Sequence, residues 1–162
     1  MNLLRKIWGI VIAAIISSCH SGTFDTISPD GTLKVGVVTT KDGDYGKAAF
    51  VVHYKGDSIL FRSELGLETD AQKFAGNLRL KSVSEPKSVI DDYKMITGKR
   101  SHCVNEASER VYSLENDEGQ ILEVTFRVYN DGIAFKYGLK AISDEEHIIN
   151  EYTAYALPKG SK

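Results

Sequence analysis

The sequence predicts an all-β protein, built as an antiparallel β-sandwich. Several short segments alternate apolar and polar residues with a period of two, which is the pattern of a strand with one buried face. Gly, Asn and Asp separate these segments, and no segment shows a 3.6-residue apolar period over a dozen residues. Two antiparallel sheets can bury their apolar faces against each other, so this pattern favours a sandwich.

The first strands are expected in the early part of the chain. Residues 28–31 read Ser-Pro-Asp-Gly, which places Pro and Gly where a tight turn uses them. Apolar residues then alternate along residues 33–38 and again along residues 50–55. A Lys-Gly-Asp-Ser turn at 55–58 leads from the second of these strands to a third at 59–61.

The clearest element is a hairpin late in the chain. Residues 122–128 and 133–139 both alternate apolar and polar side chains, and Asn-Asp-Gly at 130–132 connects them. A period of two on both sides of a short connection predicts a hairpin with one apolar face.

Two other segments are less regular. The sequence allows one helical turn at residues 70–75. It shows no obvious closing strand after residues 152–157, so it leaves open whether the sandwich is complete at its C-terminal end.

Composition limits the domain count and the partners. The 162 residues suit one domain rather than two. The 20 Lys and Arg residues nearly balance the 22 Asp and Glu residues, so the composition gives no electrostatic case for a nucleic-acid partner. Two cysteines cannot supply a disulfide framework.

The first residues predict a secretory signal peptide. A short basic start precedes an uncharged apolar run at residues 7–16, which is shorter than the roughly 20 residues that span a bilayer. The motif Ile-Ser-Ser-Cys at 16–19 resembles the lipobox of bacterial lipoproteins. That resemblance implies cleavage before Cys19 and acylation of this residue; plain secretion with a free cysteine is the alternative.

These observations divide the chain into three parts: a signal peptide at 1–18, a leader at 19–27 and the β-domain at 28–162. We expect an exported protein, a periplasmic or outer-membrane lipoprotein of a Gram-negative bacterium. Lipid on Cys19 would anchor the protein to a membrane.

Five motifs of the β-domain resemble, in order, the amino-terminal domain of glycoside hydrolase family 97. They are SPDGTLKV at 28–35, SELGL at 63–67, GKRSHCVNE at 98–106, FRVYNDGIAFKY at 126–137 and EYTAYALP at 151–158. Together they cover nearly all of the chain after residue 27. The resemblance implies a supersandwich of the galactose-mutarotase-like type.

The resemblance also implies the partners of such a domain. Members of the family are modular enzymes of saccharide utilisation that hydrolyse α-glucosides or α-galactosides. A (β/α)8 barrel follows the sandwich and carries the catalytic carboxylates, and calcium lies beside the substrate. The calcium-binding glutamate would follow Pro158 in a segment that this sequence does not include. The resemblance therefore implies no catalytic residue and no cofactor in this chain, with calcium and an α-linked saccharide bound by the full-length parent enzyme.

The acidic and histidine residues support the same expectation. Asp91-Asp92 and Glu145-Glu146 are adjacent pairs, and neighbours in an extended strand point to opposite faces, so neither pair can flank one glycosidic bond. We expect both pairs to be solvated loop charges. No two of the four histidines show a metal-ligand spacing, so no metal site is expected. Cys103 is expected to be a small buried apolar residue.

One polar cluster is the best candidate for a contact with sugar or with the barrel. Lys99, Arg100, His102 and Asn105 place hydrogen-bond donors within seven residues, and sugar hydroxyls require such donors. The alternative interpretation is a polar strand edge whose Arg100 pairs with a carboxylate elsewhere. A stand-alone carbohydrate-binding lipoprotein and a surface interaction domain without sugar are the alternative functions.

Overall fold

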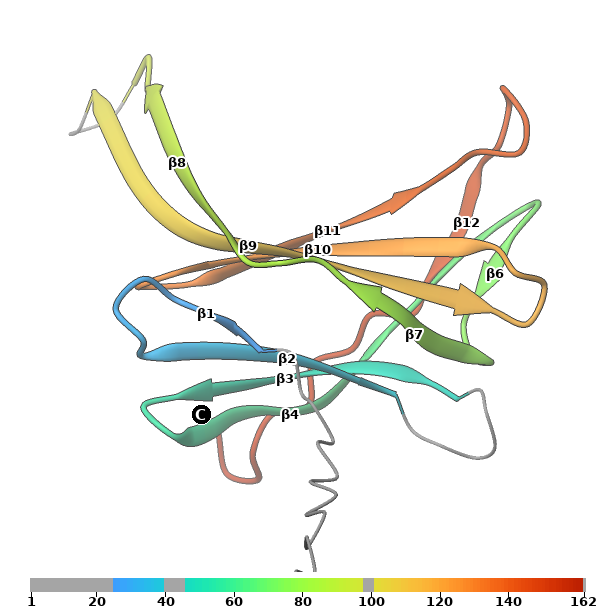
Figure 1. The fold of residues 1–162 in the computed structure, drawn as a ribbon, viewed down its shortest axis with the longest axis horizontal. Coiled ribbons are helices and arrows are strands. Elements are labelled where there is room, and N and C mark those ends of the chain that lie inside the picture. The colour runs from blue at the N-terminus through green and yellow to red at the C-terminus, as the bar shows by residue number, and fades with distance from the viewer. Residues whose placement is uncertain (1–24, 40–45, 98–100, 162) are drawn as a thin grey trace, which may run out of the picture.

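The computed structural model describes residues 25–39, 46–97 and 101–161, and within them all regular structure is β. The twelve described strands form antiparallel sheets, so the predicted fold class is confirmed (Figure 1). In these residues the structure contains no helix that is long and apolar enough to cross a membrane.

The first sheet contains four strands in chain order, each antiparallel to its neighbour. They are β1 (Thr26–Ile27), β2 (Leu33–Thr39), β3 (Ala48–Tyr54) and β4 (Asp57–Leu65). The short strand β1 lies in the segment that the sequence assigned to a leader, where Thr26 pairs with Val35 of β2. The alternation predicted at 33–38 and 50–55 corresponds to β2 and β3.

The second sheet contains five strands, and the longest of them has 15 residues. Its order is β11 (Ile133–Leu139), β10 (Ile121–Tyr129), β9 (His102–Asn116) and β7 (Leu78–Val83), with β8 (Lys87–Lys94) also paired to β9. The predicted hairpin is confirmed as β10 and β11. Its closing pair is marked by the hydrogen bond that the Tyr129 N–H donates to the Gly132 carbonyl over 2.8 Å.

The core lies between the first and second sheets. Both inner faces consist of the apolar residues that alternate along the strands, and most of them are fully buried: Val35, Val37, Phe50, Val52, Tyr112, Leu114, Leu122, Val124, Phe126 and Val128. The rings of Phe50 and Phe126 meet across the two sheets, with centroids 5.6 Å apart. Each such side chain contributes about 1.5–3 kcal/mol when it leaves water, so this layer dominates the stability of the fold.

The third sheet is small and joins the ends of the other two. Its strands are β12 (Ile148–Glu151), β5 (Leu67–Thr69) and β6 (Lys73–Phe74), in that order. The helical turn that the sequence allowed at 70–75 is therefore wrong. A tight turn joins β5 and β6 because the Thr69 hydroxyl accepts the N–H groups of Ala71 and Gln72.

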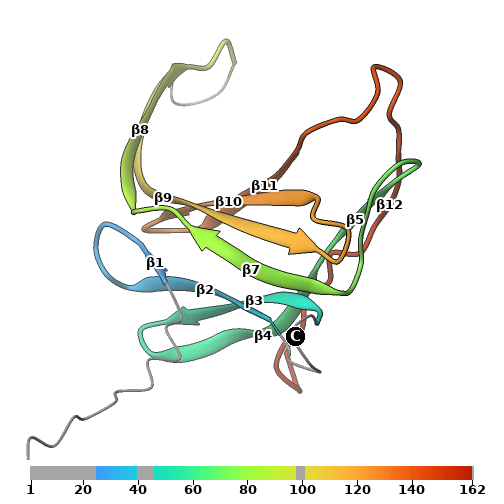
Figure 2. The same cartoon turned by 45° about the vertical axis from the view of Figure 1, so that its right-hand side comes forward.

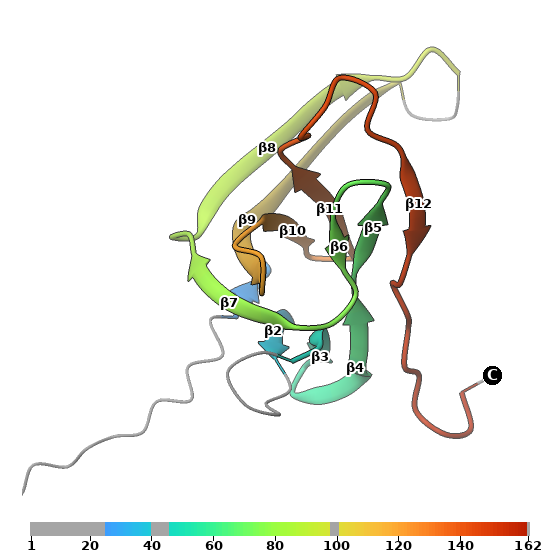
Figure 3. The same ribbon diagram turned by 90° about the vertical axis from the view of Figure 1, so that its right-hand side faces the viewer.

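The C-terminal segment covers the outer edge of β4. After β12 the chain continues beside β4, where Tyr152 donates its N–H to the Gly66 carbonyl over 2.9 Å (Figure 3). Further along, Ala154 donates to the Glu64 carbonyl over 3.0 Å, and Phe61 donates to the Ala156 carbonyl over 2.9 Å. Residues 148–156 thus cover the edges of β5 and β4, and in the described residues no strand follows them, as the sequence indicated.

Candidate interaction site on the projecting arm

The hairpin of β8 and the first half of β9 projects beyond the sandwich. We call residues 87–95 and 101–109 the arm; it rises from the second sheet, on the side away from the first sheet (Figures 1 and 2). Its two strands pair continuously, from Lys87 opposite Glu109 to Lys94 opposite His102. The sequence did not predict the arm, because residues 87–94 mix charged and apolar residues without a clean alternation.

A polar cluster ties the base of the arm to the outer face of β10. The Arg127 guanidinium donates to Glu109 over 2.6 Å and to Asp91 over 2.9 Å. The Tyr129 hydroxyl donates to the other oxygen of Asp91 over 2.5 Å. The bond to Glu109 raises the pKa of Arg127, and the bond to Asp91 raises the pKa of Tyr129. Four side chains from three strands therefore fix the angle of the arm.

Asp91 and Asp92 differ from the prediction that they are solvated loop charges. Both lie on strand β8, and alternation sends them to opposite faces of the arm. Asp91 belongs to the cluster at the base, and Asp92 lies 2.5 Å from the His102 imidazole. The pair of Asp92 and His102 is exposed, so it contributes little to stability.

The structure describes two of the four residues of the predicted donor cluster, His102 and Asn105. Lys99 and Arg100 lie outside the described residues. His102 and Asn105 are both exposed on β9, but they are an odd number of residues apart and therefore face opposite sides of the arm. The structure does not bring these two side chains together on one surface.

Asn105 lies at a shallow open depression of about 300 Å³ near the turn of the β10–β11 hairpin. The lining residues are Val104, Asn105, Glu106, Tyr129, Asn130 and Asp131. The depression therefore combines hydrogen-bonding groups with one aromatic ring.

The arm also exposes large apolar side chains. Ile90 and Val104 lie on one face with 67% and 57% of their surface exposed, and Tyr93 and Met95 are exposed on the other face. Cys103 is half-buried, with its sulfur 3.8 Å from that of Met95, rather than buried as expected. Each face of the arm thus exposes a pair of large apolar side chains, which is a property of surfaces that another molecule covers.

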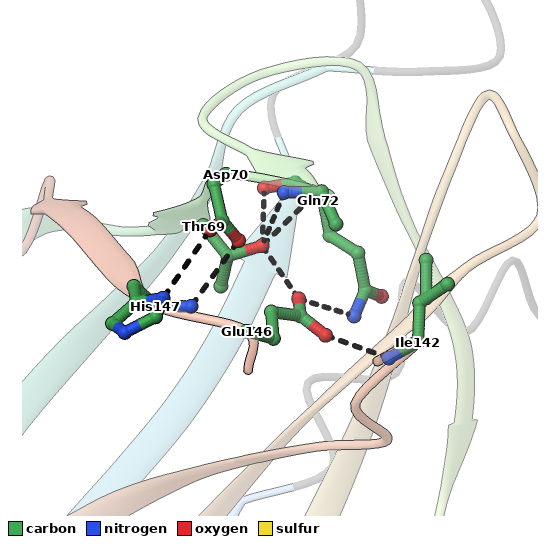
Figure 4. A network of polar contacts seen from close by, with 7 residues as sticks. Thr69, Asp70, Gln72, Ile142, Glu146 and His147 are labelled. Carbon is green, nitrogen blue, oxygen red and sulfur yellow. Dashed lines mark hydrogen bonds and ion pairs between the residues drawn. The ribbon is translucent and has the colours of Figure 1, made fainter. Parts of the chain in front are cut away.

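The second acidic pair also departs from the prediction, because Glu146 is not a free solvated charge. Its carboxylate accepts hydrogen bonds from the Thr69 hydroxyl (2.6 Å), the Gln72 amide (2.8 Å) and the Ile142 N–H (2.6 Å) (Figure 4). The bond from Thr69 is the main reason that the pKa of Glu146 is lowered. Glu146 thereby fastens the β11–β12 loop to the β5–β6 turn.

A second contact lies beside Glu146 and joins the same two segments. The Asp70 N–H donates to the His147 carbonyl over 3.1 Å, and the His147 N–H donates to the Asp70 carboxylate over 3.2 Å (Figure 4). The imidazole of His147 is exposed and lies 3.4 Å from the same carboxylate. Together with Glu146, this contact fixes the loop before β12.

The described residues do not fit a calcium ion. Calcium takes six to eight oxygen ligands, and in the part of the chain that the structure describes no group of three or more His, Cys, Asp or Glu residues is close enough to hold a metal. Asp91, Glu109 and Glu146 are already bound by donors of the protein itself. These carboxylates therefore position segments of the chain.

Sequence reasoning missed the cluster at the base of the arm. Arg127 and Tyr129 occupy the polar face of the predicted hairpin, which was a usable signal. Their partner Asp91 is more than 30 residues away in the chain, and only the pairing of β8 with β9 brings it to them.

Comparisons with known proteins agree with this architecture. The family model described as glycosyl-hydrolase 97 N-terminal matches residues 27–162. A probable retaining alpha-galactosidase of Streptomyces bingchenggensis (strain BCW-1) is 28% identical over 166 residues, which cover 97% of this chain and 26% of that protein. The chain thus spans about a quarter of the length of this curated relative.

Solved structures share the fold. A beta-arabinopyranosidase aligns with a TM-score of 0.74 and 29% identity, covering 83% of this chain and 21% of that one. A family 97 glycoside hydrolase of Pseudoalteromonas sp. strain K8, solved in complex with panose, aligns with a TM-score of 0.70 and 20% identity, covering 83% and 20% of the two chains. Since the family model matches most of its length, this chain belongs to glycoside hydrolase family 97, as an amino-terminal domain.

Proposed function

We propose that this chain is a non-catalytic domain that packs on a (β/α)8 barrel and helps to shape the substrate entrance of an α-glycosidase. The observation that carries the proposal is the exposed apolar surface of the arm. Ile90 and Val104 on one face, and Tyr93 and Met95 on the other, stay in water unless a further domain covers them. The curated relative leaves room for such a domain, since this chain spans only about a quarter of its length.

The base of the arm supports this role. An isolated two-stranded hairpin is marginally stable in water, so a free arm would lose its shape without support. Arg127 supplies this support because it binds Asp91 and Glu109 from both strands of the arm at once. An arm held at a fixed angle binds a partner at a lower entropic cost than a mobile one.

Two measurements test this function. The DNA immediately 3′ of the codon for Lys162 should encode a (β/α)8 barrel, and a stop codon with no barrel nearby would remove the proposed partner. The purified chain should not hydrolyse nitrophenyl α-glucosides or α-galactosides. Activity that a calcium chelator abolishes would contradict the non-catalytic role.

The depression at Asn105 favours a second candidate, a stand-alone carbohydrate-binding lipoprotein. It combines polar side chains, which can bind sugar hydroxyls, with the ring of Tyr129, on which a sugar can pack. Calorimetric titration of the chain with α-glucan oligosaccharides tests it. Binding that Asn105→Ala abolishes would favour this candidate, with Asn150→Ala on the exposed strand β12 as the matched control. The barrel-packing proposal expects no binding by the isolated chain.

We also propose that Cys19 is acylated and that the protein is a periplasmic or outer-membrane lipoprotein of a Gram-negative bacterium. The support is the order of basic, apolar and small residues before Cys19. Labelled palmitate should enter the wild-type chain and the Cys103→Ser variant but not the Cys19→Ser variant. Label that stays in the Cys19→Ser variant would contradict the proposed site.

A further inference from the structure

The outward face of the first sheet carries its own exposed apolar residues. Ile27 on β1 is 42% exposed, and Ile59 and Phe61 on β4 are 41% and 49% exposed. Ile27 is paired with Lys34 of β2, and Lys34 is paired with His53 of β3. Lys34 and His53 lie between core-facing residues on their strands, so these three side chains are on the face opposite the core.

Irregular pairing of β4 presents Phe61 and its basic neighbour Arg62 to water. Leu60 is opposite Val52 and Ser63 is opposite Phe50, so two residues stand on β4 where a regular strand has one. A β-bulge of this kind leaves the extra residue without a partner on the neighbouring strand and bends the strand, and the N–H of Phe61 instead donates to the Ala156 carbonyl. Phe61 and Arg62 are the two residues, and both are exposed.

Basic side chains surround this face. Lys34 and Arg62 are exposed on it, and Lys55 lies in the β3–β4 turn, where its ammonium is 5.1 Å from the centre of the Tyr54 ring. Asp25 and Asp57 lie near the same edge, so the positive balance is small. Apolar side chains between basic ones are the composition of a surface that lies in the interface of a lipid bilayer.

The length of chain before β1 limits how far this face can be from the membrane. Asp25, the first described residue, lies six positions after Cys19 in the sequence. A fully extended chain reaches about 3.5 Å per residue, so the first sheet begins at most about 20 Å from an acyl group on Cys19. This step rests on the proposed acylation of Cys19.

We propose that the outward face of the first sheet docks on the bilayer that holds the lipid of Cys19. Ile27, Ile59 and Phe61 enter the headgroup region, and Lys34 and Arg62 contact lipid phosphates. This orientation points the arm away from the membrane, because the arm rises on the side of the second sheet that faces away from the first (Figure 1). The partner of the arm then approaches from the aqueous side.

A single tryptophan tests this orientation. The sole native tryptophan, Trp8, lies in the proposed signal peptide, so a tryptophan introduced by substitution is the only one in the mature chain. Acylated Phe61→Trp and Val104→Trp variants would be placed on phosphatidylethanolamine and phosphatidylglycerol vesicles that contain a brominated phospholipid. We expect a blue shift and quenching for Phe61→Trp, and neither for Val104→Trp on the arm.

Three other results would contradict the docking proposal or the acylation on which it rests. Equal emission with and without brominated lipid in both acylated variants would overturn the docking proposal while leaving the acylation in place. Absence of palmitate label would refute acylation itself, which is a separate result. A blue shift of Phe61→Trp without vesicles, together with a dimeric elution volume, would show that a second copy covers the face. Ile27→Trp is a second probe if Phe61→Trp fails to fold.

Discussion

At the scale of single residues, Gly66 is the point where three segments meet. Its N–H donates to the Tyr137 hydroxyl over 3.1 Å, and its carbonyl accepts from Tyr152. The Tyr137 hydroxyl also lies 2.8 Å from the Thr153 hydroxyl. One backbone unit therefore joins the corner between β4 and β5 to β11 and to the C-terminal segment.

Gly66→Ala should destabilise the protein by about 1–3 kcal/mol, the usual cost of overpacking. A methyl group at this position would lie 2.6 Å from the Phe74 carbonyl oxygen and 3.1 Å from the Tyr152 side chain, and a backbone atom cannot easily move away. Urea unfolding measures the loss. Gly132→Ala is the control, because nothing lies within 4 Å of its added carbon. Equal losses in both variants would contradict the steric explanation.

Glu146 predicts a dependence of stability on pH. Its pKa in the folded protein is lowered, so its stabilising effect is full above the pKa of the unfolded chain and is lost as the pH falls through the folded pKa. Glu146→Gln should therefore lose less stability than wild type between neutral and acidic pH, as measured by thermal unfolding. Glu145→Gln, at the exposed neighbour, should follow the wild-type profile. If the stability of Glu146→Gln also depended on pH as that of the wild type does, this explanation would be wrong.

At the scale of elements, the arm depends on its base more than on its own pairing. The two strands hydrogen-bond only to each other along most of their length, and a two-stranded ribbon gains little stability alone. The bonds of Arg127 to Asp91 and Glu109 connect both strands of this ribbon to the neighbouring strand β10.

Asp91→Asn should loosen the arm without unfolding the sandwich. The variant keeps the shape of the side chain but loses its charge, so the bonds from Arg127 and Tyr129 weaken. Hydrogen exchange should become faster at the backbone amides of β8 and remain slow in β10. Asp92→Asn is the control, because the partner of Asp92 is His102 near the tip of the arm. Unchanged exchange in Asp91→Asn would contradict the role of the cluster.

At the scale of the whole molecule, several described strands keep an open edge, and the longest of them are β8 and β11. In the described residues, β8 pairs only with β9, and β11 pairs only with β10. Free edges invite pairing with another chain, and exposed apolar residues on the arm add to that tendency. By contrast, residues 148–156 protect the edges of β4 and β5.

We expect the isolated chain to be marginally stable or to self-associate. Ile133→Pro should lower the association, because it removes one N–H from the open edge of β11. That N–H faces away from β10, since Ile133 follows the hydrogen-bonded closing pair of the hairpin. Light scattering during gel filtration and a thermal melt provide the measurement. A sharp two-state melt at high temperature with monomeric elution of the wild-type chain would count against this expectation.

The sequence by itself determined the fold class, the β10–β11 hairpin and the core-facing residues of β2 and β3. These features are local, because a period of two and a turn motif are encoded within a dozen neighbouring residues. The family resemblance carried by the five motifs was also readable without coordinates, and the family model confirms it.

Only the tertiary structure decided which polar residues act together. Asp91 and Glu146 look like solvated charges in the sequence, yet each binds partners from distant strands. His102 and Asn105 look like one donor cluster, yet strand alternation separates them onto opposite faces. The physical reason is that a side chain's partners depend on strand pairing, which brings together residues far apart in the chain, whereas a hydrophobic pattern depends only on the neighbours in sequence.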